Sequence, residues 1–329
     1  MQHRKHHRLV PLLAAAFTLA LASNTFAQST APYPTKPVRM VVPNGAGGPT
    51  DVVARLLAQG LTETWGQQVV VENRPGAAGN LGTEAVAKAP ADGHTLLMSA
   101  SGPIVMAKPL FEKLAIDPTK DLVPISLLAW IPLIIYVAPQ LPVNNLADFL
   151  RYTKERPGKL NYASTGPGST TNIMTELFKR QSGADLVHVP YKAVPQAIAA
   201  VMTGETAMFL DTTSTLSHVK TGKLKALAIA SRARFSGAPD LPTATEAGLA
   251  GFTAEPWVGL LAPAGTPREL RQKIQTDSAK YLLTPAMKAQ LAAIGFDAVG
   301  GGIDAFAEVI ATEAVRWNTV VKAAGIKLE

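Results

Sequence analysis

Two glycine-rich segments carry the residues that could bind a small anion. The first runs from Asn44 to Asp51 (Asn-Gly-Ala-Gly-Gly-Pro-Thr-Asp) and contains no lysine or arginine. Its glycines leave backbone N–H groups accessible, and Pro49 suits the first position of a helix. The N–H groups of Thr50 and Asp51 would then point out of a helix start, where the positive end of the helix dipole attracts anions. A tight turn without a ligand is the alternative interpretation.

The second segment runs from Ser164 to Thr171 (Ser-Thr-Gly-Pro-Gly-Ser-Thr-Thr) and adds several hydroxyl groups to its glycines. Hydroxyl groups both donate and accept hydrogen bonds, so they suit a small polar ligand that needs orientation. One of them is expected to cap the following helix instead. Asp211, at the end of an expected strand, is a further candidate, and a cap over the turn at 212–214 is its alternative role.

No pattern indicates a catalytic or metal centre. A serine–histidine–acid triad could be assembled only from dispersed residues: Ser164, Ser169, His94, His188, His218 and Asp211. The Gly-x-Ser-x-Gly motif of a nucleophile elbow is absent. The scattered histidines and the lack of cysteine give no metal-ligand spacing, and neither phosphate-binding glycine motif is present. We therefore predict no catalytic residue, no metal and no cofactor.

The segments that must position the two loops read as alternating strands and helices. Residues 38–42 form an apolar run typical of a buried strand, and Val53, Leu57 and Leu61 form a helical stripe after it. Further strands are expected at 68–72, 95–100, 160–163, 186–189, 206–210, 224–230 and 258–261. Further helices are expected at 81–89, 145–153, 267–283, 285–293 and 304–324. This alternation predicts doubly wound α/β domains, which bind ligands beyond the carboxyl ends of their strands.

The first 27 residues resemble a cleaved export signal. A basic start with Arg4, Lys5 and Arg8 precedes an apolar run at 9–22, and Thr25-Phe26-Ala27 fits a cleavage site. Without the leader, 28 basic residues face 24 acidic ones, a net charge of +4 with no basic run. This distribution argues against a nucleic-acid partner. The expected product is a soluble periplasmic protein.

Two breaks divide the rest of the chain into two expected lobes. Pro132 interrupts an apolar stretch at 122–139, which rules out one continuous central strand. A segment rich in proline and glycine at 239–256 precedes the strand expected at 258–261. We expect one lobe to comprise 36–135 with 252–329, and the other to comprise 136–251.

Five strings carry a family resemblance when they are taken together. They are Val-Glu-Asn-Arg-Pro-Gly-Ala-Ala-Gly-Asn-Leu-Gly at 71–82, Ala-Asp-Gly-His-Thr-Leu-Leu at 91–97, Val-Pro-Tyr-Lys at 189–192, Leu-Pro-Thr at 241–243 and Trp-Val-Gly-Leu-Leu-Ala-Pro-Ala-Gly-Thr-Pro at 257–267. With the first glycine loop, they resemble the extracytoplasmic solute receptors of tripartite tricarboxylate transporters, the Bug-type (TctC-like) family. The resemblance spans essentially all of the chain after the leader. It implies a type II periplasmic-binding-protein fold, in which two doubly wound α/β lobes are joined by a two-stranded hinge.

The resemblance also implies a ligand site, with a small carboxylate (organic acid, aromatic acid or amino acid) held largely by backbone N–H groups and water. The implied ligand-binding residues are Asn44, Ala46, Gly47, Gly48, Pro49, Thr50 and Asp51 in the first lobe, and Ser164, Thr165, Gly168, Ser169, Thr170 and Asp211 in the second. Asn44 replaces a common aromatic residue and Asn172 a frequent histidine, so an unusual ligand is expected. The implied partners are the membrane permease subunits of the transporter, and the receptor is expected to be a monomer. A receptor read by a signalling partner and, more remotely, an exported hydrolase are the alternatives.

Overall fold

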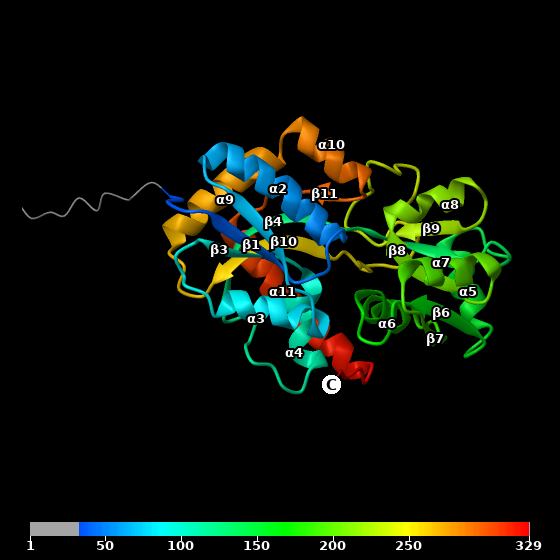
Figure 1. Cartoon of the computed structure of the whole chain (residues 1–329). Helices are drawn as coiled ribbons and strands as arrows, with labels where there is room; N and C mark the ends of the chain where they lie inside the picture. Colours follow the sequence, from blue (N-terminus) through cyan, green and yellow to red (C-terminus); the bar gives the residue numbers. More distant parts are fainter. Residues whose placement is uncertain (1–32, 329) are drawn as a thin grey trace, which may run out of the picture.

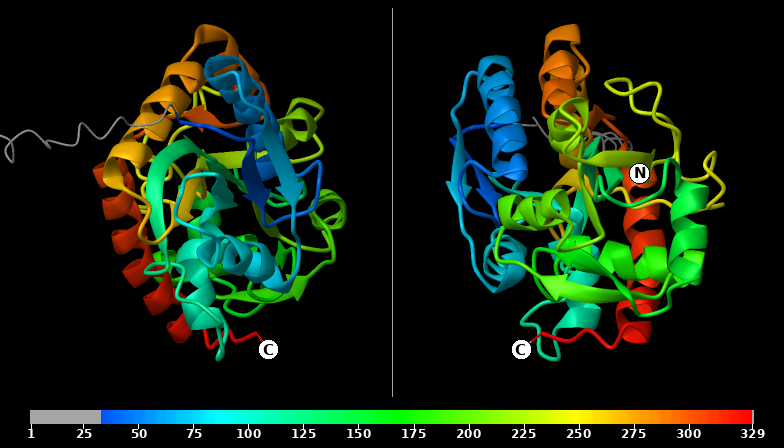
Figure 2. Two further views of the ribbon diagram at one scale, coloured as in Figure 1. Left: turned by 60° about the vertical axis from the view of Figure 1, so that its left-hand side comes forward. Right: turned by 90° about the vertical axis from the view of Figure 1, so that its right-hand side faces the viewer.

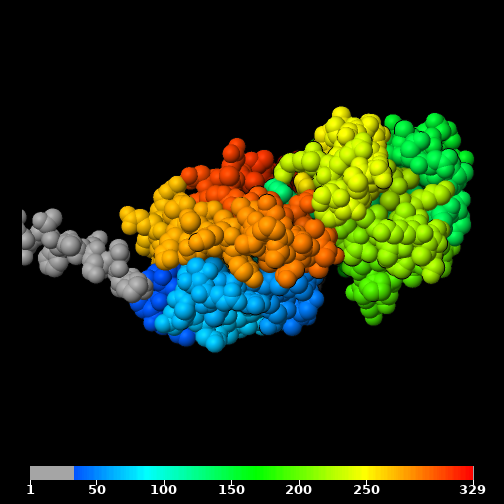
Figure 3. All heavy atoms as spheres, turned by 90° about the horizontal axis from the view of Figure 1, so that it is seen from above, coloured from blue at the N-terminus to red at the C-terminus, as the bar shows by residue number. Residues whose placement is uncertain are grey.

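The structure is a computed structural model that describes residues 33–328, so the predicted export signal lies outside the described part. Its strands form two separate sheets, and helices cover both faces of each (Figure 1). Viewed from above, the molecule has two bodies joined by a narrower waist (Figure 3). Within the described residues, we find no helix with the length and apolar character needed to cross a membrane.

The first sheet has the strand order β11-β4-β10-β3-β1-β2. Its strands are β1 (Val38–Val42), β2 (Val69–Asn73), β3 (Thr95–Ala100), β4 (Leu122–Trp130), β10 (Trp257–Pro263) and β11 (Asp297–Ala298). β1 runs parallel to β2 and β3, whereas β10 lies antiparallel between β3 and β4. Its helices are α2 (Pro49–Trp65), α3 (Asn80–Ala87), α4 (Ala107–Leu110), α9 (Arg268–Leu282), α10 (Pro285–Ala293) and α11 (Ile303–Ala323). Short helical turns η1 (Ala77–Gly79) and η2 (Gly102–Met106) precede α3 and α4.

The second sheet has the strand order β7-β6-β8-β5-β9. Its strands are β5 (Leu133–Val137), β6 (Leu160–Ser164), β7 (Leu186–Pro190), β8 (Met208–Thr212) and β9 (Lys225–Ile229). β6 runs parallel to β7 and β8, and β5 runs antiparallel to β8 and β9. The helices are α5 (Leu146–Lys154), α6 (Thr170–Ser182), α7 (Val194–Thr203) and α8 (Leu216–Lys220), with a short turn η3 (Thr213–Thr215) before α8.

Two chain segments cross between the sheets and pair with each other. The first crossing lies at 131–132, between β4 and β5, and the second is the long return from β9 to β10. Ile131 N–H donates to the Pro256 carbonyl at 2.7 Å, and Ala230 N–H donates to the Leu133 carbonyl at 2.7 Å. Pro132 has no N–H for a ladder, so one strand ends before it and the next begins after it. Residues 133–135, expected in the first lobe, therefore belong to β5 of the second sheet.

Helix α11, red in Figure 2, runs along one side of the molecule. It packs against α6 of the second lobe. One buried apolar cluster includes Trp317 and Val320 of α11 together with Phe178 of α6. The ring of Phe252, in the return segment, packs edge-on against Phe178 with centroids 5.5 Å apart. The lobes thus share part of one hydrophobic core, on the side where the C-terminal helix crosses between them.

The expected α/β elements are largely present, with β1, β3 and α10 at the expected bounds and most others within one or two residues. Strand β8 extends to Thr212, so Asp211 lies inside a strand and not after it. The sequence interpretation missed β11, α8, η2 and α4, and the short turns η1 and η3. The helical segment formed by η2 and α4 begins with Gly102 and Pro103, which resemble turn residues although proline is well tolerated in a first helical turn.

Candidate functional site

A cavity of about 320 Å³ opens between the two lobes, at the carboxyl ends of β1 and β3 and the start of α6. The second lobe lines it with Gly168, Ser169 and Thr170. The lining residues of the first lobe are Pro43, Asn44, Gly45, Pro75, Gly76, Ala78, Gly79, Ala100, Gly102, Pro103, Met106, Ala107, Leu110 and Phe111. None of the lining side chains, all in the described part of the chain, carries a charge. A concave, mostly apolar site with a few polar groups is typical of small-molecule binding.

The first glycine loop is fixed from inside by Asp51, whose side chain is buried. Its carboxylate accepts hydrogen bonds from Gly47 N–H at 2.8 Å, from Arg55 Nε at 2.9 Å and from Asn73 Nδ2 at 2.9 Å. Burial opposes ionisation, but the hydrogen bonds from Arg55, Gly47 and Asn73 outweigh it and lower the pKa of Asp51. Gly47 has a φ of 79°, a left-handed conformation that glycine adopts without strain. The bent loop therefore encloses an ionised carboxylate of its own.

The second glycine loop leads into α6, and Ser169 is the helix cap that the sequence predicts in this segment. Its Oγ accepts from Asn172 N–H at 3.3 Å and donates to the Gly166 carbonyl at 2.7 Å. Thr171 Oγ1 accepts from Thr165 N–H at 3.0 Å and is 3.2 Å from Thr165 Oγ1. Much of the hydroxyl content of this loop therefore holds the loop itself.

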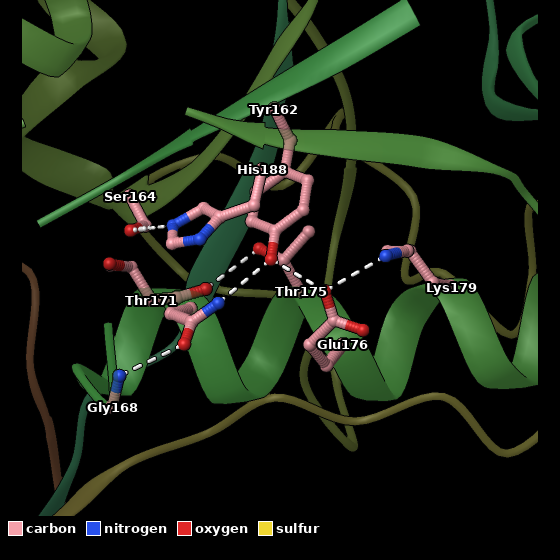
Figure 4. Close-up of polar contacts among 9 residues, drawn as sticks. Tyr162, Ser164, Gly168, Thr171, Thr175, Glu176, Lys179 and His188 are labelled. Atoms are coloured by element: carbon pink, nitrogen blue, oxygen red, sulfur yellow. Dashed lines mark hydrogen bonds and ion pairs between the residues drawn. The ribbon is translucent and has the colours of Figure 1, made fainter. Parts of the chain in front are cut away.

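A chain of polar contacts fixes the second loop from behind (Figure 4). Asn172 Oδ1 accepts from Gly168 N–H at 3.0 Å, and Asn172 Nδ2 donates to the Tyr162 hydroxyl at 2.8 Å. Tyr162 donates to Glu176 Oε1 at 2.6 Å, and Lys179 Nζ donates to the same oxygen at 2.9 Å. Burial and the Glu176 carboxylate both raise the pKa of Tyr162, so its hydroxyl stays protonated. Asn172 is thus a positioning residue, and Gly168 N–H is already occupied.

The structure brings only some of the predicted site residues to the cavity. Asn44, Gly168, Ser169 and Thr170 line it. The others lie along the first loop, behind the second loop or in the second sheet: Ala46, Gly47, Gly48, Pro49, Thr50, Asp51, Ser164, Thr165 and Asp211. Asn44 is the one lining residue with a side-chain amide, and its Oδ1 is buried without a hydrogen-bond partner.

Asp211 is buried in β8 and accepts a hydrogen bond from Thr215 Oγ1 at 2.6 Å. Burial raises its pKa, and the hydrogen bonds from Thr215 and Thr212 N–H partly offset this effect. The Thr215 contact matches the alternative role of Asp211, a cap over the turn that follows its strand.

One serine–histidine pair from the triad candidates is in contact. Ser164 Oγ and His188 Nε2 are 2.6 Å apart, and the His188 ring stacks on Tyr162 (Figure 4). Ser164 is fully buried, and its Oγ also accepts from Gly166 N–H at 3.0 Å. Glu176, the nearby acid, is bonded to Tyr162 and Lys179 instead. Among residues 33–328, no cluster of three potential metal ligands occurs.

The sequence interpretation missed the apolar wall of the cavity. Pro103, Met106, Ala107 and Leu110 line it from η2 and α4, at the i, i+3, i+4, i+7 spacing of one helix face. The loop after β3 also lies at the carboxyl end of a parallel strand, which is a usual place for ligand contacts. The helical spacing of these apolar residues and the position of their segment directly after β3 were the two sequence signals that could have revealed this wall.

The C-terminal residues cover one edge of the cavity. Leu328 N–H donates to the Leu110 carbonyl at 2.7 Å, and Leu328 forms a parallel bridge with Phe111. A Cβ built on Gly168 would lie only 2.8 Å from Leu328 Cδ1, so this leucine contacts the second-lobe loop directly. A first-lobe segment therefore reaches across to the second lobe beside the cavity.

Two α/β lobes, two crossing segments and a cavity between the lobes define the class of two-lobed solute-binding proteins with a type II periplasmic-binding-protein fold. The family model of the tripartite tricarboxylate transporter family receptor matches residues 53–326. The chain belongs to this receptor family.

Sequence relatives agree with this membership. The chain is 37% identical over 299 residues to protein BugT of Bordetella pertussis, covering 90% of this chain and 92% of the relative. It is 33% identical over 310 residues to a Pseudomonas protein of the tcbD-tcbE intergenic region. That match covers 93% of this chain and 92% of the relative.

Solved structures agree in both fold and sequence. R. palustris Rpa4515 with adipate has a TM-score of 0.76 at 34% identity, covering 90% of this chain and 100% of that one. MatC from Rhodopseudomonas palustris with bound malate has a TM-score of 0.72 at 34% identity, covering 88% and 100%. The periplasmic binding protein BugD has a TM-score of 0.72 at 32% identity, covering 90% and 100%.

Proposed function

We propose that this protein is a periplasmic receptor that captures a small carboxylate between its lobes and delivers it to a tripartite tricarboxylate-type transporter. The observation that carries the proposal is the cavity between the lobes, which the start of α6 faces and no charged side chain lines. The carboxylates named for the solved relatives, adipate and malate, support the same class of ligand.

The start of α6 can hold a carboxylate without a salt bridge. Thr170 and Thr171 lie in the first helical turn, where backbone N–H groups have no acceptor within the helix. The helix dipole adds about 0.3–1 kcal/mol, and each hydrogen bond to a charged acceptor adds about 1.5–3 kcal/mol. The Asn44 amide, across the cavity, can contribute one more contact. A few such contacts are enough for micromolar affinity, about −8 kcal/mol, after the costs of association.

The proposal also covers the closure of the lobes, the oligomeric state, export and the transporter partner. The lobes, which divide near 131–132 and near the start of β10, close over the ligand by bending at the paired crossing segments. The receptor acts as a monomer, after cleavage of the leader at Ala27, and its closed form is recognised by membrane permease subunits. It has no enzymatic activity, because the Ser164–His188 pair is part of the loop support and is not exposed to the cavity.

Thermal-shift measurements with matched ligands test the proposal. Hexanoate, benzoate and malate are compared with their primary amides, since a ligand that binds the folded state raises its stability. At least one carboxylate should raise the melting temperature more than its amide. Gly45→Phe, which fills the cavity from its lining, should abolish this shift, whereas Ala115→Phe, at an exposed position outside the lining, should retain it. Equal shifts for acids and amides would contradict the proposal.

Uptake measurements separate transport from signalling. A strain that lacks the receptor should lose uptake of the bound carboxylate and regain it when the gene is restored. Normal uptake together with a lost transcriptional response would instead identify a signalling receptor.

A further inference from the structure

Helices α2 and α6, which follow the two glycine loops, differ in whether an acidic side chain already occupies the helix start. The first turn of α2 contains Asp51, and its ionised carboxylate accepts from Gly47 N–H and Arg55. The first turn of α6 contains no acidic residue. Because a negative charge in the first turn satisfies the positive end of a helix dipole, only the α6 end remains open to a ligand anion.

The positions of the two helix starts agree with this difference. Ser169 and Thr170, at the start of α6, line the cavity. Residues 46–51, which form the rest of the first loop and the start of α2, do not. Of these two helix starts, only that of α6 borders the cavity.

The rest of the cavity suits an uncharged body. The face of η2 and α4 presents Pro103, Met106, Ala107 and Leu110, and Phe111 continues it. No lysine, arginine or histidine occurs among the lining residues. A second ligand carboxylate placed against this face would lose water, and these apolar side chains offer it neither a hydrogen-bond donor nor a positive charge, which is unfavourable.

We propose that this receptor selects monocarboxylates with an apolar aliphatic or aromatic body and discriminates against dicarboxylates of the same length. This inference rests on the proposed function, since it assigns the ligand class of the same cavity. Adipate and malate, the ligands named for two solved relatives, are both dicarboxylates.

Calorimetry on the unmodified protein with two length-matched pairs is the first test. Hexanoate is compared with adipate, and 4-methylbenzoate with terephthalate, at pH 7.5, where all the carboxyl groups are ionised. In at least one pair, the monocarboxylate should bind at least about tenfold more tightly, because its second end has no charge to desolvate. Equal or tighter binding of the dicarboxylate in both pairs would overturn the inference and leave the proposed function intact. Failure of every carboxylate to bind would contradict both.

A charge-placement variant is the second test. Phe111→Arg puts a cation at a partly exposed lining position, and Ala115→Arg adds the same charge at an exposed position of the following loop. Phe111→Arg should shift the ratio of adipate to hexanoate affinity towards adipate by about tenfold, whereas Ala115→Arg should leave the ratio unchanged. An unchanged ratio in Phe111→Arg protein with a cooperative melting transition would contradict an apolar end at this wall. If that variant does not fold, the length-matched pairs decide the question alone.

Discussion

Glu255 is a buried carboxylate at the crossing between the lobes, and replacing it with glutamine should change how stability depends on pH. Only 8% of its surface is exposed, and its Oε2 has no hydrogen-bond partner. Arg232 Nη1 is the cation facing it, at 3.6 Å. Burial raises the pKa of Glu255 to about 7, the nearby Asp297 and Glu313 carboxylates add to this effect, and Arg232 opposes it.

The sign of the pH effect follows from the raised pKa. Below about pH 4.5, Glu255 is protonated in both the folded and the unfolded state, so it costs nothing. Between about pH 4.5 and 7, the unfolded chain releases this proton while the folded protein retains it, so the free energy of unfolding falls as pH rises. Since one pKa unit corresponds to about 1.4 kcal/mol, the loss from Glu255 reaches about 3 kcal/mol above pH 7.

Glu255→Gln keeps the shape of the protonated acid and removes the titration. The variant should match the unmodified protein near pH 4.5 and exceed its free energy of unfolding by up to about 3 kcal/mol at pH 8. Urea unfolding at both pH values measures the difference. Glu246→Gln is the matched control, because this nearby carboxyl is exposed and its pKa is lowered by Thr243 N–H and Arg234. A Glu255→Gln variant that is less stable than the unmodified protein at pH 8 would refute the reasoning.

Three further substitutions test the loops and the cavity edge. Asp51→Asn should reduce the free energy of unfolding by about 2 kcal/mol at pH 7, because it weakens charge-assisted hydrogen bonds. Urea unfolding curves at pH 7 and pH 3 should show a smaller difference in stability between the variant and the unmodified protein at pH 3. Gly47→Ala should cost about 1 kcal/mol through its φ of 79°, whereas Gly45→Ala, with no atom within 4 Å of its added Cβ, should cost much less. Leu328→Ala should weaken hexanoate binding severalfold in calorimetry by uncovering the cavity edge, whereas Lys327→Ala, which removes an exposed ion pair, should not. Equal costs for the two glycines, or equal affinities for the last pair, would contradict these assignments.

The sequence predicts the strands and helix starts because local physics dominates there. β1 and β3 are mostly apolar and mostly buried, as expected for strands covered on both faces, and Pro49 fixes the start of α2. The family resemblance then supplied the two-lobed arrangement. The helix at 102–110 was missed because Gly102 and Pro103 mimic a turn, although its apolar spacing was visible.

The roles of individual polar groups were harder to predict because they depend on contacts between distant residues. Asp51 fits a ligand contact or an internal anion equally well until Asn73, 22 residues away, is seen to donate to it. Asn172 acts through Tyr162 on the preceding strand. Leu328 reaches Gly168 only because α11 carries the chain across to the second lobe. Sequence spacing contains no signal for such contacts.

The central claim is that a carboxylate is bound by neutral donors at the start of α6, without a cationic side chain. Calorimetry of hexanoate binding at low and high salt, for example about 20 and 500 mM, tests it most directly, because salt screens attraction between opposite charges. The account predicts a dissociation constant that changes by no more than about twofold over this range. A loss of affinity of about tenfold or more at high salt would show that the anion is held by a cationic group, and would contradict the account.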